Sequence, residues 1–297
     1  MKTPPPGTPA PVPAPSTAVA AVAVPRGGFA AGVRAVRVVW HRELLRFSSD
    51  RLRVLTALIQ PLLFVFVLGT GLGSLTRGVP GVDFKTFVYP GALAMSVLFT
   101  AVFSAGSIVW DREFGFLREM LVAPVSRTAL VIGKCLGGAT TATAQGVIVL
   151  ALAGLVGVPY DPLLLLTLLG EMALLAFTLT CFGVMMAARI TTFQAFMGLT
   201  QMLLMPLFFT SGALFPLSGL PGWLAFVTRV NPLTYAVDPI RRAVFAHLDI
   251  GARARAAYAP GVTWGSHHVP VWLEVSIVAV CGVVMLVVAS WEFRQAD

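Results

Sequence analysis

Residues 110–134 read WDREFGFLREMLVAPVSRTALVIGK, a charged segment between two uncharged runs that each exceed 20 residues. These runs are Thr86–Trp110 and Cys135–Val158, and each is long enough to cross the roughly 30 Å hydrocarbon layer of a bilayer as a helix. Seven charged side chains lie between Asp111 and Lys134. Because charged side chains favour the aqueous phase, a charged loop between two membrane spans predicts contact with a soluble partner.

The composition of the whole chain also indicates a membrane protein. Of 297 residues, 57% are hydrophobic and 11% are charged, and the mean hydropathy is +0.85. A soluble domain has roughly a quarter charged residues, so we expect membrane lipid to contact much of this surface. The net charge of +8 does not predict a nucleic-acid partner, because the basic residues lie beside apolar runs, as in oriented membrane proteins. The three cysteines have no CxxC neighbour, and we predict no metal site.

Further apolar runs complete a predicted all-α membrane protein with six transmembrane helices. The other four spans are predicted at residues 54–75, 162–188, 193–215 and 275–291. The uncharged stretch Ile190–Thr228 would be roughly 58 Å long as one helix, about twice the hydrocarbon thickness. It is therefore expected to break at its prolines and glycines. Leu220–Val230 would then re-enter the membrane or lie on it, as an outer helical segment between spans five and six.

Two segments precede the spans. Residues 1–28 are rich in Pro and Ala and are expected to form a disordered tail. Residues 29–53 contain six arginines and an apolar stripe at helical spacing, which predicts an amphipathic interfacial helix, with an ordinary soluble helix as the alternative; the stripe is Val33, Val36, Trp40, Leu44 and Phe47. Residues 54–297 form the predicted six-span domain. Six spans place both termini in the cytoplasm of a multi-pass protein of the cell (plasma) membrane.

Within the charged segment, Arg112–Val122 can form about three helical turns before Pro124. A short amphipathic helix there could transmit movement from a soluble partner into the adjoining spans, and an inert turn is the alternative. Gly133-Lys134 does not complete a phosphate loop, because Thr128 stands where that motif needs glycine and Cys135 follows the lysine. We therefore do not expect this chain to bind ATP in that way.

Glu171 lies about nine residues into the predicted fourth span. An ionisable side chain within a membrane is costly and usually faces a polar interior. It would contact a cationic cargo or carry a proton, or it would simply hydrogen-bond to Thr167, Thr178 or a neighbouring helix.

Two motifs give a resemblance to a known family. Residues 112–127, REFGFLREMLVAPVSR, followed by Gly133-Lys134, resemble the signature loop of ABC-2 type transporter permeases. Residues 231–241, NPLTYAVDPIR, resemble the motif that this family carries between its fifth and sixth spans. The likeness extends over residues 30 to 295 and is nearest to the daunorubicin-resistance and nodulation-factor export permeases.

The resemblance implies a half-transporter: two membrane subunits, identical or paralogous, with two copies of a separate ATP-binding subunit that hold ATP and Mg. No cofactor is implied in this chain. The implied ATPase-coupling residues are Arg112, Glu113, Phe114, Gly115, Phe116, Leu117, Arg118, Glu119, Met120 and Pro124. A second cytoplasmic contact is implied at Arg189, Thr191 and Gln194. The implied cargo path follows the second and fifth spans, and its candidate lining is Phe99, Phe103, Met202, Met205, Phe208 and Phe209, with Glu171 as a further candidate.

The expected function is that of a permease subunit in an ATP-driven exporter of a hydrophobic drug, a lipid or a glycolipid. ATP hydrolysis would then belong to the partner subunit, and this chain would not itself be an enzyme. The alternative is a proton-driven secondary multidrug transporter, which would need a relay of carboxylates within the membrane.

Overall fold

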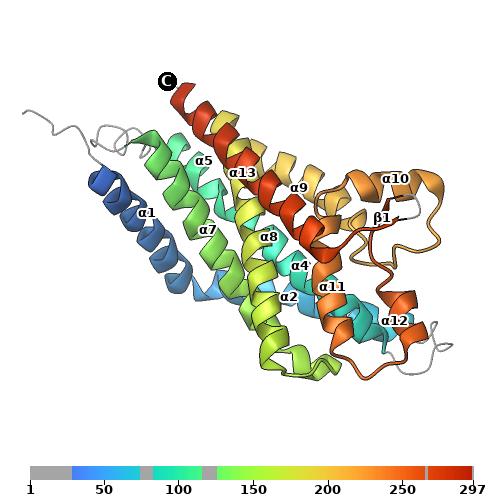
Figure 1. Ribbon diagram of the computed structural model, residues 1–297. Coiled ribbons are helices and arrows are strands. Elements are labelled where there is room, and N and C mark those ends of the chain that lie inside the picture. The colour runs from blue at the N-terminus through green and yellow to red at the C-terminus, as the bar shows by residue number, and fades with distance from the viewer. Residues whose placement is uncertain (1–28, 74–82, 116–125, 265–266, 296–297) are drawn as a thin grey trace, which may run out of the picture.

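Helices make up nearly all of the structure, a computed structural model that describes residues 29–73, 83–115, 126–264 and 267–295 (Figure 1). The first half contains α1 (Phe29–Ser49), α2 (Arg51–Leu63), the π-helix η1 (Phe64–Leu68), α3 (Gly69–Gly73), α4 (Phe84–Ser104), α5 (Gly106–Glu113), α7 (Arg127–Leu150) and the short 3₁₀ helix η2 (Ala153–Val156). The second half contains α8 (Pro162–Arg189), α9 (Phe193–Phe209), α10 (Gly222–Val230), α11 (Thr234–Ala246), α12 (Ala252–Tyr258), the antiparallel strands β1 (Thr263–Trp264) and β2 (His267–His268), and α13 (Val271–Gln295).

Four helical stretches in the described chain are long and apolar enough to cross a membrane, namely Val54–Gly71, Phe84–Glu113, Pro162–Arg189 and Val271–Gln295. They correspond to predicted spans one, two, four and six. The other two predicted spans are the helices α7 and α9. α9 is apolar but has 17 residues, and Lys134, Gln145 and several threonines and glycines lower the mean hydropathy of α7. The chain is thus a multi-pass helical membrane protein, and the number six remains a prediction.

Side-chain caps set where the long helices begin. Asp83 accepts a hydrogen bond from the Lys85 amide at the start of α4, and Asp161 accepts two at the start of α8. Ser126 and Thr192 cap α7 and α9 in the same way. These caps satisfy amide groups that have no partner within the helix. As a result, α7 begins at Arg127, well before the start predicted from hydropathy at Cys135.

The uncharged stretch after α8 breaks, as predicted from its prolines and glycines. α9 ends at Phe209 rather than at the predicted Phe215, and the chain turns at Gly212, whose φ of 76° favours glycine. α10 then begins at Gly222, close to the start predicted for the outer segment. Whether α10 enters the membrane remains a prediction.

α1 packs lengthwise beside α7 (Figure 1). A Cβ atom on Gly133 would lie 2.8 Å from Cβ of Val39, and one on Gly137 would lie 2.7 Å from Cβ of Glu43. The two glycines, spaced four apart, therefore allow close packing within the chain.

Most residues of the predicted apolar stripe lie on the partly covered side of α1. Val36, Trp40, Leu44 and Phe47 are partly covered, whereas Val33 is 52% exposed. The predicted segment 29–53 divides in the structure, because α1 ends at Ser49 and Arg51 begins the helix that continues into the first span. The position of α1 on a membrane surface remains a prediction.

α4 is the central helix, and nearly all of its residues from Thr86 to Val102 are buried. It contacts α2, α7, α8, α9 and α11. Gly91 permits one of these contacts, because a Cβ atom there would lie 2.5 Å from the backbone oxygen of Ala213. α4 therefore packs against α7, α8 and α11, and it also borders α2 and α9.

Candidate functional site

The C-terminus of α8 is capped by a side chain from α5. Arg112 Nη1 donates to the carbonyl oxygens of Ala187 (3.1 Å) and Ile190 (2.7 Å), and Nη2 donates to that of Ala188 (3.0 Å). The last carbonyls of a helix have no partner within the helix, and a cation is favourable at this end. Arg112 thus fastens the end of α5 to the end of α8.

The neighbouring residue binds the start of α9. Glu113 Oε2 accepts a hydrogen bond of 2.8 Å from the backbone amide of Phe193, and an anion is favourable at a helix N-terminus. The Trp110 ring lies 4.7 Å from that of Phe114 and 5.3 Å from that of Phe193, measured between centroids. We call this arrangement of Arg112, Glu113 and the turn between α8 and α9 the α5–α9 joint.

The joint brings together the two regions that the resemblance implied as contacts with the ATPase. Thr191 lies exposed in the turn after α8, Gln194 lies exposed at the start of α9, and Arg189 pairs with Glu292 of α13 at 2.8 Å. Gly115, with a φ of 83°, follows the end of α5. The predicted helix therefore does not start at Arg112, which belongs to the last turn of α5. The other implied coupling residues lie outside the described residues: Phe116, Leu117, Arg118, Glu119, Met120 and Pro124.

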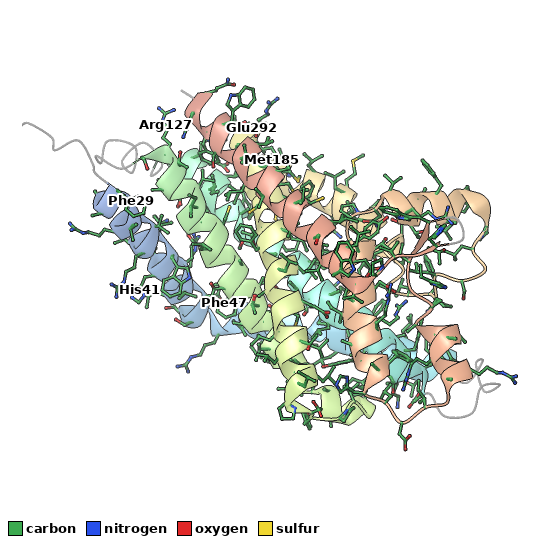
Figure 2. The ribbon with its side chains drawn as sticks, viewed as in Figure 1. Phe29, His41, Phe47, Arg127, Met185 and Glu292 are labelled. Carbon is green, nitrogen blue, oxygen red and sulfur yellow. The ribbon has the colours of Figure 1, made fainter. Side chains whose placement is uncertain are left out.

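The ends of α7 and α13 lie at the same end of the bundle as the joint, where Figure 2 labels Arg127 and Glu292. Arg127 Nη1 donates to the carbonyl oxygens of Phe293 and Arg294, both at 3.2 Å. Arg294 in turn donates to Thr128 Oγ1. Arginines therefore cap both α8 and α13 at this end of the bundle.

A buried ionic cluster joins α1 to α5 and α7. Lys134 Nζ lies 2.6 Å from Glu43 Oε1, 2.9 Å from Ser107 Oγ and 3.3 Å from Asp111 Oδ2, and its side chain is 3% exposed. Arg42 donates to both carboxylate oxygens of Asp111 at 3.0 and 2.9 Å. We call these residues the Lys134 cluster. Sequence reasoning missed it, although Glu43 interrupts the apolar stripe of α1.

A groove runs along α4, between α1 and α2 on one side and the start of α9 on the other. It consists of two adjoining pockets of about 360 and 220 Å³ that share Phe47, Thr100 and Phe103. The wider pocket is lined further by Glu43, Arg46, Ser104, Gly106, Ser107, Trp110, Thr141, Phe193 and Met197, and the narrower one by Val54, Thr56, Ala57, Gln60, Pro61, Met95, Ser96, Phe99 and Gln145. We call it the α4 groove.

The α4 groove contains part of the candidate cargo path. Phe99 and Phe103 line it, with ring centroids 5.7 Å apart. From α9, the lining residues are Phe193 and Met197. The four candidates further along α9 do not line the two pockets: Met202 and Phe209 are exposed, Met205 is partly buried, and Phe208 is buried with its ring 5.7 Å from that of Phe64. Their role in a cargo path remains a prediction.

Glu171 lies elsewhere, in a buried cluster between α8, α11 and α13. Here Arg242 contacts Asp238 Oδ2 at 2.6 Å and Glu274 Oε1 at 2.8 Å, and Glu171 is near enough for its carboxylate to be repelled by that of Asp238. We call these four residues the Asp238 cluster. Among the described residues, Glu171 Oε2 is buried without a hydrogen bond.

The two threonines considered as partners of Glu171 bond elsewhere. Thr167 donates to the carbonyl of Leu163 and Thr178 to that of Val278. No described group of three or more His, Cys, Asp and Glu residues is placed to hold a metal ion.

A glutamine at position 171 tests how this carboxyl is used. Glu171→Gln removes one of three neighbouring carboxylates, so we expect the free energy of unfolding to stay unchanged or to rise by up to about 1 kcal/mol. Asp238→Asn should lower it, because Arg242 loses a charged partner. Thermal unfolding in detergent measures both. A loss above about 2 kcal/mol in Glu171→Gln would contradict this expectation, and normal stability with lost transport would assign Glu171 a functional role.

The first and last residues of the motif 231–241, Asn231 and Arg241, both form hydrogen bonds with the end of α9 and the turn that follows it. Asn231 Nδ2 donates to the Leu207 carbonyl at 2.6 Å and to Thr210 Oγ1 at 2.9 Å. Arg241 Nη2 donates to the carbonyls of Gly212 (2.6 Å) and Ala213 (3.0 Å). The motif thus satisfies backbone groups that the break after α9 leaves without helical partners.

Arg241 is itself almost fully buried. Nη1 donates to the Phe215 carbonyl at 3.3 Å, and the guanidinium lies 4.6 Å from the Phe87 ring centroid. Burial lowers the pKa of Arg241 to about 10, and the Asp238 carboxylate opposes that shift. The guanidinium therefore stays charged at neutral pH.

Long apolar helices whose charged side chains pair with one another across the fold define a multi-pass helical membrane protein. Residues 34–245 match the family model described as ABC-2 type transporter, and the chain belongs to that family.

Its relatives include transport permeases from several organisms. The chain is 28% identical to nodulation protein J of Rhizobium meliloti (strain 1021), over 74% of this chain and 87% of that protein. It is 26% identical to the putative transport permease ycf38 of Cyanophora paradoxa, over 70% of this chain and 73% of that protein. It is 31% identical to the probable multidrug ABC transporter permease YbhR of Escherichia coli (strain K12), over 58% of this chain and 47% of that protein.

Proposed function

We propose that this chain is the permease subunit of an ATP-driven exporter of a hydrophobic drug, a lipid or a glycolipid. The family and its relatives support transport, since those relatives are described as transport and multidrug permeases. In this proposal two copies of a separate ATP-binding subunit bind ATP and Mg, and a second permease, identical or paralogous, completes the assembly. Both termini and the loop after α5 then face the cytoplasm of the cell.

The α5–α9 joint carries this proposal. Glu113 lies in the last turn of α5, next in sequence to the predicted coupling loop, and it accepts a hydrogen bond from the backbone amide of Phe193. Phe193 and Met197 in turn form one wall of the α4 groove. A partner that pulls on the loop would therefore shift the start of α9 relative to α4 and change the width of the groove.

A second candidate function is proton-driven transport. The Asp238 cluster supports it, because two buried carboxylates, Asp238 of α11 and Glu274 of α13, pair with Arg242, and Glu171 of α8 has a buried carboxylate oxygen. Such a group is the kind of relay that the sequence did not reveal, since its members are far apart along the chain. Efflux that follows an imposed proton gradient in the absence of ATP would favour this candidate over the first.

Removing the Glu113 side chain should uncouple ATP hydrolysis from export. In Glu113→Ala, the start of α9 loses its charged cap, worth about 1–2 kcal/mol, and α5 loses its hydrogen bond to the groove wall at Phe193. We expect export about tenfold slower while the partner subunit still hydrolyses ATP. The assay is efflux from vesicles that contain this chain with its ATP-binding subunit, with ATP consumption measured in parallel.

Glu113→Gln is the matched control, because its amide oxygen can still accept the bond from the Phe193 amide. We expect it to retain most of the export rate. Equal export by wild type and Glu113→Ala would contradict the coupling role of the joint. A full loss of both activities would instead indicate that the variant no longer binds the ATPase.

A further inference from the structure

Two charged residues line the wide end of the α4 groove, Arg46 and Glu43. In the adjoining Lys134 cluster, Arg42 and Lys134 are the cations and Glu43 and Asp111 are the two carboxylates. Arg42 and Lys134 are paired with those carboxylates at 2.9 and 2.6 Å. The uncompensated charge is therefore that of Arg46.

Arg46 is also the cation that lines the groove. It belongs to the wall of the wider pocket, and it makes no hydrogen bond or ion pair with the described residues. At the neighbouring joint, Arg112 and Glu113 contribute one charge of each sign, so they do not cancel it. A guanidinium with five donors beside a pocket favours an anion, which it can bind through two parallel hydrogen bonds.

The narrower pocket contains an independent observation that points to a ligand. Gln145 of α7 is fully buried and lines this pocket, yet its Oε1 has no hydrogen-bond partner among the described residues. Its Nε2 has only a long contact of 3.5 Å, to the Val54 carbonyl. A buried amide oxygen without a donor is costly, and a hydroxyl or amide group of a bound molecule would satisfy it.

The surface between these two polar points is apolar. Phe47 and Phe103 belong to both pockets, Phe99 follows in the narrower one, and Met197 closes the wider one. Together the two pockets have the size of a typical small-molecule site, roughly 300–1,000 Å³. The order of the lining is thus a cation, an aromatic and aliphatic stretch, and a buried acceptor.

We propose that the α4 groove binds an anionic amphiphile, with its headgroup at Arg46, its hydrocarbon chain along Phe103 and Phe99, and a donor group at Gln145. This assignment rests on the proposed function in treating the groove as the cargo path. The same chemistry describes an exported anionic lipid-like molecule and an anionic phospholipid of the surrounding membrane.

The test compares three amphiphiles that share a twelve-carbon chain: dodecyl phosphate, dodecyl maltoside and dodecyltrimethylammonium. The purified full chain is held in nanodiscs of zwitterionic lipid, and bound amphiphile is counted by native mass spectrometry. We expect dodecyl phosphate to bind about tenfold more tightly than the other two, as for a hydrogen bond to a charged group. Arg46→Gln should abolish this preference.

Arg37→Gln is the matched control, because Arg37 is an exposed arginine of the same helix that does not line either pocket. It should keep the preference for phosphate. Phe103→Ala should weaken binding of all three amphiphiles alike, since it shortens the apolar wall. Equal binding of the three by wild type would overturn the proposal, and so would equal losses in Arg37→Gln and Arg46→Gln.

Nanodiscs that contain phosphatidylglycerol separate the two sources of the ligand. If this lipid displaces dodecyl phosphate from wild type but is not retained by Arg46→Gln, the occupant is a membrane phospholipid. If dodecyl phosphate binds undiminished, the groove selects a single-chain anionic cargo. Both results support an anionic amphiphile. Because binding is measured without ATP, failure of export in the vesicle assay would not affect this result.

Discussion

Replacing Lys134 with methionine is expected to lower the free energy of unfolding by about 3–5 kcal/mol. Methionine has a similar length, so the loss comes from charge rather than from a cavity. Lys134 Nζ is the cation nearest to Glu43, at 2.6 Å, and both side chains are at least nine-tenths buried. Without it, the carboxylate of Glu43 remains buried and uncompensated, and a stability loss of this size is a large part of the total for most proteins.

The double variant Lys134→Met, Glu43→Gln tests this explanation. It removes the pair together, and Asp111 keeps Arg42 as its partner at 2.9 Å. We expect it to recover most of the lost stability, because an ion pair that is removed as a whole leaves no unpaired charge. Thermal unfolding in detergent and the yield of monodisperse protein from membranes measure the effect. A single variant as stable as the wild type would show that Glu43 has another partner or is neutral.

The Lys134 cluster also shows why hydropathy located the long helices but not their ends. The sequence placed the third span after Lys134 and the sixth after Glu274, because charged side chains were excluded from the membrane. In the structure both residues lie inside helices, α7 and α13, and Arg242 pairs with Glu274 at 2.8 Å. Their partners are 91 and 32 residues away along the chain. A charge that is paired across the fold does not end a helix, and a single sequence does not reveal the pairing.

Some residues of the candidate site were likewise predicted from the sequence, and others were recognised only from their neighbours in the structure. The aromatic residues Phe99 and Phe103 were predicted from the resemblance, and they do line the α4 groove. Arg46 was predicted only as part of a basic face, and Gln145 was not singled out. Only the fold shows that the cations near Arg46 are paired with carboxylates and that Gln145 Oε1 has no hydrogen-bond partner among the described residues. The sequence therefore predicted the aromatic character of the groove lining, but only the structure shows which polar side chains in it have no partner among the described residues.

Replacing Arg241 with methionine should lower the free energy of unfolding by about 3–5 kcal/mol, because three carbonyl groups lose their donor. Each unsatisfied carbonyl costs about 1–3 kcal/mol, and relaxation of the surrounding structure relieves part of this cost. Those carbonyls belong to Gly212, Ala213 and Phe215. The Ala213 carbonyl cannot retreat toward α4, because it already approaches Gly91 so closely that a Cβ atom there would lie 2.5 Å from it.

Arg229→Met is the control for Arg241→Met, since Arg229 is an exposed arginine of the same region and its loss should change stability by less than about 0.5 kcal/mol. Arg241→Lys should fall between the two, because a single ammonium keeps the charge but lacks the planar fork that reaches several carbonyls at once. Unfolding curves of the three variants in one detergent test this order. If Arg241→Met and Arg229→Met unfold alike, the carbonyls after α9 must find other donors. The motif at residues 231–241 would then have a role other than holding the end of α9.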